Sequence, residues 1–80
     1  MSYKELDSVV LVRDLPNHAL CRGDAGTVVH VYGPDAYEVE FLRASGTTAA
    51  VVELTGTDIR AGRDDDQLAV RSRAEATNAD

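Results

Sequence analysis

The sequence predicts a small all-β domain, folded as a strongly bent, five-stranded antiparallel barrel. The chain has 80 residues, which is short for a domain and leaves room for a single core. Its β-branched and aromatic residues lie in short runs separated by turn residues, and no long amphipathic helix lies between them, which argues against a parallel α/β sheet. Short antiparallel strands have to bend to bury one face, so a small barrel is expected.

The first two strands are expected at residues 8–13 and 27–32. Residues 8–13 form a β-branched run, and Pro16 ends the ladder soon after because its nitrogen has no hydrogen to donate. Residues 23–26 combine two glycines with an aspartate, which is turn chemistry, and the valine-rich run 27–32 follows directly. A turn and a second strand are therefore expected here.

The last three strands are expected at residues 37–42, 48–54 and 59–61. Apolar and acidic side chains alternate through residues 37–42, as in a strand with one buried face. The turn before it, residues 33–36, contains a proline that suits the first central position of a type I turn. Residues 55–60 suit a short helical turn that leads into the last strand.

The apolar residues on the inward side of these strands give a predicted core. They are Val9, Leu11, Leu15, Leu20, Val29, Val31, Tyr37, Val39, Phe41, Val51, Leu54 and Ile59. A register slip of one residue would exchange Val28 and Val29, so the inward one of this pair stays open.

Two regions of the chain differ in composition. Residues 1–61 hold nearly all the large apolar side chains and form the predicted barrel domain. Residues 62–80 contain only Leu68 and Val70 as larger apolar residues, so we expect a C-terminal extension that is a largely disordered, flexible tail. Within it, residues 68–71 have the composition of a short strand.

The charge of the chain favours a protein partner over nucleic acid. Fourteen Asp and Glu residues against eight Lys and Arg residues give a formal net charge of −6. Nine acids against five bases leave −4 on residues 1–61, and five against three leave −2 on residues 62–80. Phosphate contacts need clustered Lys and Arg, whereas a net-acidic domain attracts basic protein surfaces.

Composition also predicts the compartment. The single cysteine, Cys21, allows no disulfide within the chain, which favours a reducing environment. The first residues show no basic segment followed by an apolar one, so no secretion signal is predicted. No apolar run approaches the length of about 20 residues that a membrane helix needs. We therefore expect a cytoplasmic protein without membrane contact.

The motifs occur in an order that resembles a known family. They are residues 6–11, residues 14–16, residues 20–32 and residues 36–41. Together they resemble the bacterial family known as domain of unknown function 4926, over residues 5–61. The resemblance implies an SH3-like small barrel and supplies no catalytic residues. It also implies a partner-binding role, because members are encoded beside other small proteins, including suspected toxin–antitoxin partners.

A second, shorter resemblance gives an alternative function. Residues 26–31, a glycine followed by threonine, valines and a histidine, resemble the KOW motif of ribosomal and transcription-factor barrels. This resemblance implies an RNA- or ribosome-associated binding module. The basic residues that accompany the motif in that class are missing here, and any barrel strand also requires a glycine turn followed by valines.

Other motif-like groups suit ordinary structural roles. His18 and Cys21 lie close in sequence, but zinc needs three or four ligands, and no third group completes a nucleophile. Residues 22–24, Arg-Gly-Asp, are expected to form a turn in which the glycine takes a positive φ and the aspartate accepts a bond from a backbone amide. Glu38 and Glu40 share one strand face, where a solvated surface is expected and not an acid–base pair.

The sequence thus predicts a non-enzymatic protein-interaction module with no catalytic residues, cofactor or metal site. The expected partner is another protein, encoded nearby, bound through an exposed strand edge or the loops after the first and second strands. The candidate interface residues are His18, Arg22 and Tyr32, the last because tyrosine is favoured in interfaces. The chain is expected to be a monomer or a weak homodimer.

Overall fold

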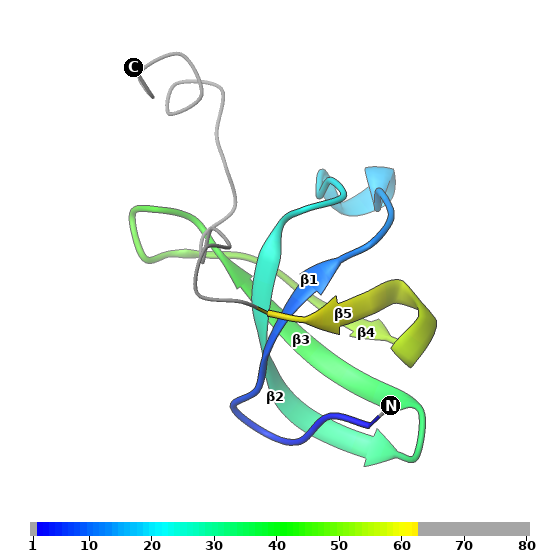
Figure 1. Cartoon of the computed structure of the whole chain (residues 1–80). Coiled ribbons are helices and arrows are strands. Elements are labelled where there is room, and N and C mark those ends of the chain that lie inside the picture. The colour runs from blue at the N-terminus through cyan, green and yellow to red at the C-terminus, as the bar shows by residue number, and fades with distance from the viewer. Residues whose placement is uncertain (1, 63–80) are drawn as a thin grey trace.

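The computed structural model describes residues 2–62. They form strands and two short 3-10 turns (Figure 1). In chain order these are β1 (Ser8–Leu11), η1 (Pro16–His18), β2 (Ala25–Gly33), β3 (Ala36–Leu42), β4 (Thr48–Leu54), η2 (Gly56–Asp58) and β5 (Ile59–Ala61). All the strands predicted for this part of the chain are confirmed, whereas the predicted extension, residues 62–80, lies outside the described residues apart from Gly62. No helix of the described part is long and apolar enough to cross a membrane.

The strands of residues 2–62 form an antiparallel five-stranded sheet in the order β4-β3-β2-β1-β5. Consecutive hairpins join β2, β3 and β4, whereas β5 pairs with β1 (Figure 1). The prediction of a strongly bent barrel is corrected here, because the sheet is neither closed nor strongly curled. A closed barrel would require hydrogen bonds between the strands β4 and β5. Instead, the chain turns through η2 after β4, and β5 pairs with β1.

β2 is the longest of the described strands, and a glycine near its start lets β3 approach it closely. Gly26 lies opposite Val9 of β1 and is buried. A Cβ atom at Gly26 would lie 2.8 Å from the carbonyl oxygen of Glu40 and 2.9 Å from Cδ1 of Phe41 on β3. The glycine that the sequence places in a turn is therefore needed inside β2 for close strand packing.

An apolar cluster forms the core of the described residues. Its members are Val9, Leu11, Leu15, Leu20, Val28, Tyr37, Val39, Phe41, Val52, Leu54 and Ile59, with Val31 among the partly buried side chains packed against them. The prediction that Val29 and Val51 belong to the core is wrong. Both are exposed, and their neighbours Val28 and Val52 are buried instead. The pairing of β2 with β3 shifts register directly after Val28, and Val51 lies opposite the outward Glu40.

The β1–β2 loop is an ordered hairpin extension. Leu15 and Leu20 are both buried and exchange backbone hydrogen bonds of 2.8 and 3.2 Å. The predicted Arg-Gly-Asp turn is confirmed: Gly23 has a φ of 95°, and the Asp24 carboxylate accepts a bond from the Cys21 amide at 2.8 Å. These contacts fix the loop against the core.

Candidate functional site

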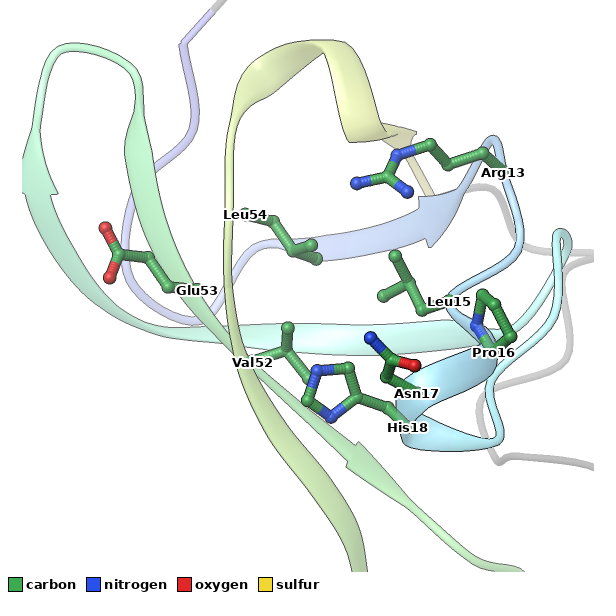
Figure 2. Close-up of a pocket in the computed structure, with 8 residues that line it drawn as sticks. All are labelled: Arg13, Leu15, Pro16, Asn17, His18, Val52, Glu53 and Leu54. Carbon is green, nitrogen blue, oxygen red and sulfur yellow. The ribbon is translucent and has the colours of Figure 1, made fainter.

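A cleft of about 250 Å³ lies between the β1–β2 loop and β4 (Figure 2). Its lining residues are Arg13, Leu15, Pro16, Asn17 and His18 from the loop, and Val52, Glu53 and Leu54 from β4. The side chains of Leu15, Val52 and Leu54 lie beneath the cleft and are almost fully buried, so the accessible surface of the cleft is mainly polar. A small cleft of this kind, mainly polar and with a few apolar atoms at its base, is suited to a side chain or short segment of a protein partner.

The turn η1 fixes the backbone of His18 at this rim. Pro16 begins the turn, where its missing N–H costs no hydrogen bond. The His18 amide donates to the Leu15 carbonyl at 3.0 Å, and the Ala19 amide donates to the Pro16 carbonyl at 3.2 Å. Ala19 then takes a left-handed φ of 56°, which ends the turn. Because Leu15 is buried, this chain of contacts places His18 relative to the core.

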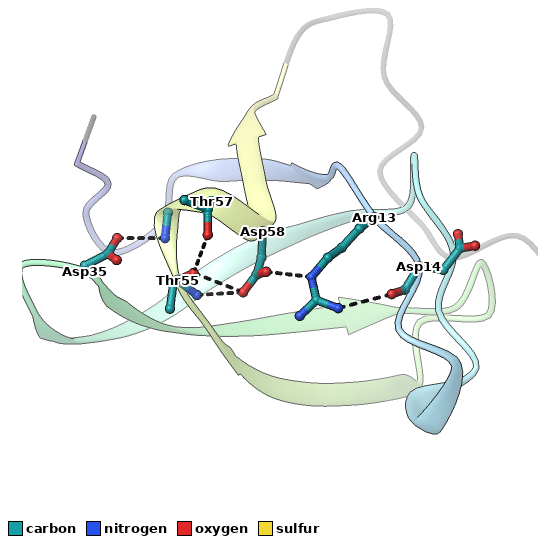
Figure 3. A network of polar contacts seen from close by, with 7 residues as sticks. Arg13, Asp14, Asp35, Thr55, Thr57 and Asp58 are labelled. Carbon is teal, nitrogen blue, oxygen red and sulfur yellow. Dashed lines mark hydrogen bonds and ion pairs between the residues drawn. The ribbon is translucent and has the colours of Figure 1, made fainter.

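An ion pair joins the wall of the cleft to η2 (Figure 3). The Arg13 Nε donates to Oδ1 of Asp58 at 2.7 Å. The other carboxylate oxygen of Asp58 accepts from the amide and the hydroxyl of Thr55 at 3.0 and 3.2 Å, which completes a capping box. The Gly56 amide donates to Asp35 at 2.8 Å, so η2 is also joined to the β2–β3 turn. Asp58 thus holds η2 and the β1–β2 loop in one arrangement.

These contacts determine the protonation of Asp58. Partial burial opposes its charge, but hydrogen bonds from the Thr55 backbone and from Arg13, together with the positive charge of Arg13, lower the pKa of Asp58 below its ordinary value. Its side chain is only 13% exposed, so water screens this pair less than it screens a fully exposed pair. The carboxylate is therefore ionised at neutral pH and holds Arg13 beside the cleft.

The outward side of β3 and β4 carries three glutamates, Glu38, Glu40 and Glu53, which we call the acidic face. Glu38 and Glu53 are direct cross-strand partners, and Glu40 lies two residues along β3 on the same side. Within residues 2–62 neither Glu38 nor Glu53 forms an ion pair. Like charges directly opposite on neighbouring strands destabilise a sheet, so this arrangement lowers the stability of the free protein.

Tyr32 of β2 lies beside the acidic face. It is 53% exposed, and its ring packs edge-on against His30 with centroids 4.6 Å apart. Partial desolvation, the negative charges of Glu38 and Glu53, and a hydrogen bond with Glu38 raise the pKa of the Tyr32 hydroxyl. Tyr32 is therefore neutral at physiological pH and presents a hydroxyl next to two carboxylates.

The structure separates the three predicted interface residues. His18 lines the cleft. Arg22 lies in the turn before β2, where its amide donates to Asp14 at 2.8 Å, and it is not among the cleft-lining residues. Tyr32 lies beside the acidic face. The cleft therefore includes one of the three predicted residues.

Sequence reasoning missed Asp58 and the β4 side of the cleft. Thr55 and Asp58 have the spacing of a capping box, so a local signal for Asp58 was present. The roles of Val52 and Glu53 depend on the approach of the β1–β2 loop to β4, more than 30 residues further along the chain. No local pattern encodes that approach.

The His and Cys side chains of the β1–β2 loop lie on its surface. His18 and Cys21 are both exposed, and Cys21 is a free thiol. In the part of the chain that the structure describes, no group of three or more His, Cys, Asp and Glu side chains is arranged to hold a metal ion.

Comparison with known proteins identifies the family. The family described as domain of unknown function (DUF4926) matches residues 5–61, which is more than half of the chain. No curated protein and no solved structure matches the chain. The matched residues run from the segment before β1 to the end of β5, so they contain the cleft, η2 and the acidic face. The chain belongs to the DUF4926 family, as its motifs predict.

Proposed function

We propose that the protein is a non-enzymatic interaction module that binds another protein at the free edge of β4 and in the cleft beside it. The observation that carries this proposal is the edge of β4: within the described residues this strand has a neighbour on one side only, and the cleft lined by Leu15, Val52 and Leu54 lies beside it. An edge strand presents backbone N–H and C=O groups that a partner strand can use. Addition of such a strand is a recurring mode of peptide recognition.

The composition of β4 suits this role. The strand has seven residues and contains neither proline nor lysine, the residues that commonly protect an edge from pairing. Val51 is 47% exposed on it. The other edge strand, β5, has three residues and offers few backbone groups. A partner strand therefore gains more hydrogen bonds at β4.

We also propose that the sheet is an open relative of SH3-like small barrels. The strand order, and the 3-10 turn before a short last strand that pairs with the first, support this relationship. Folds of this kind carry many functions, so the site must carry the functional argument. The partner we propose is a cytoplasmic protein encoded nearby, of toxin–antitoxin-like kind.

The KOW-like alternative has less support from the charges around it. Residues 26–31 lie in β2, where Gly26 and Val28 are buried and cannot contact a ligand. Glu38 lies opposite His30 on the neighbouring strand. A carboxylate at that position repels phosphate, so we do not propose RNA binding.

Co-purification with the product of the neighbouring gene tests the proposed function. We expect the two proteins to form a complex, and the activity of the neighbouring product to change when this protein is added. His18→Ala should weaken the complex about fivefold to tenfold, because His18 lines the cleft.

Arg22→Ala is the matched control, because Arg22 belongs to the same loop and does not line the cleft. Its complex should keep the affinity of the unaltered protein. Equal affinity of the His18→Ala variant and the unaltered protein, or recovery of RNA alone, would contradict the proposed function.

A further inference from the structure

We propose that the partner segment is an extended strand in which apolar residues alternate with Lys or Arg. This inference rests on the proposed function and specifies the chemistry of the partner. The segment pairs with β4 and places its apolar side chains in the cleft and its basic side chains over the acidic face.

The geometry of β4 sets the alternation. Val52 and Leu54 belong to the core side of the strand, whereas Val51 lies opposite Glu40, and Glu53 opposite Glu38, on the outward side. Glu53 also borders the cleft, but its side chain points to the outward side. Figure 2 shows the Glu53 side chain on the other side of β4 from Leu54. Side chains of an added strand alternate with the same period of two. Every second residue of the partner therefore faces the cleft, and the residues between them face the acidic face.

The charges of the acidic face set the chemistry of the outward residues. Glu38 and Glu53 lie directly opposite each other and form no ion pair within residues 2–62. Glu40 is bonded to the Thr48 hydroxyl at 2.9 Å and adds a third negative charge. A neighbouring strand with Lys or Arg beside Glu53 offsets the repulsion that the free protein carries.

A second copy of the chain is the other occupant that a free edge can accept. Pairing of β4 with β4 of another copy would bring the two acidic faces side by side in one sheet. The net charge of −6 on each chain opposes that approach. A basic segment meets no such repulsion and is therefore favoured over a second copy.

Selection from a display library of random ten-residue peptides on the full chain tests the inference. We expect the enriched sequences to alternate apolar residues with Lys or Arg. Binding of an enriched peptide should weaken as salt is raised, because exposed charges are screened. It should be lost when alternate backbone amides of the peptide are N-methylated, because these donate to β4. Enrichment of acidic or non-alternating sequences would overturn the inference.

Glu53→Lys separates binding from folding. The change replaces the like-charge pair with Glu38 by an opposite-charge pair, so the free protein should become more resistant to urea. Affinity for the enriched peptide should fall about tenfold. Ala44→Lys places the same side chain in the exposed β3–β4 turn and should change the affinity less than about twofold. Equal losses in both variants, or a joint loss of stability and affinity in Glu53→Lys, would contradict the inference.

Two outcomes distinguish this inference from the proposed function. An enriched peptide without basic residues that still loses affinity in His18→Ala would overturn the inference and leave the proposed function in place. Native-partner binding that is unchanged in His18→Ala would contradict the proposed function.

A further outcome concerns a second copy of the chain as the occupant. A dimer of the chain that Val51→Lys dissociates would assign the β4 edge to a second copy and so overturn the inference.

Discussion

Gly26 and Asp58 each lie where two segments of the chain come into close contact. Gly26 allows β3 to approach β2 because no Cβ lies between them. Asp58 accepts hydrogen bonds from Thr55 and Arg13 at the same time. The sequence marks both residues only as turn or loop chemistry, since the close approach at Gly26 comes from a strand more than ten residues away.

Gly26→Ala should lower the free energy of unfolding by about 1–3 kcal/mol, because the added methyl group overlaps the Glu40 carbonyl and the Phe41 ring. Urea unfolding of both proteins measures the difference. Gly33→Ala is the matched control on the same strand, where a Cβ meets nothing within 4 Å. That variant should stay within about 0.5 kcal/mol of the unaltered protein. Equal losses in the two variants would refute the packing role of Gly26.

Strands and short turns form where local sequence patterns indicate them. The alternation of Tyr37, Val39 and Phe41 with glutamates predicts β3 because its period of two matches a half-buried strand. The inward residue of the Val28–Val29 pair could not be predicted, because the register shift in β2 depends on pairing with β3. Local signals therefore identify the elements, and pairing between elements decides which side chains are buried.

The contact between η2 and the β1–β2 loop should make stability depend on pH in acid. The pKa of Asp58 is lower in the folded protein than its ordinary value, so its contribution is complete above the unfolded-state pKa of about 3.9 and is lost as the pH falls through the folded-state pKa. Asp58→Asn should cost about 1–2 kcal/mol at pH 7. Unfolding at a series of pH values should show this cost shrinking in acid.

Arg13→Gln is the companion measurement for this prediction. Because Arg13 contributes to the lowered pKa of Asp58, its loss should reduce the acid dependence without abolishing the bonds from Thr55. A difference between the unaltered protein and Asp58→Asn that stays constant with pH would contradict the role of the ionised carboxylate.

Residues 2–62 form an open sheet, and the candidate site combines segments of it that lie far apart in sequence. Barrel closure could not be judged from the sequence, because it depends on whether the edges β4 and β5 meet, and no local pattern reports on that. Among the described strands, the same openness leaves β4 with a free edge beside the cleft. His18 was predicted as an interface residue from its loop, but Val52 and Leu54 join it only through the fold.

Amide hydrogen exchange of the free chain and of its complex with the native partner measures whether β4 is the docking edge. We predict slower exchange within Thr48–Leu54 in the complex, because amides of an edge strand become hydrogen-bonded to the added strand. Exchange in Ile59–Ala61 should stay unchanged. Unchanged exchange in β4, with slowing confined to β5 or to the Arg22 turn, would contradict the assignment of β4 as the binding edge.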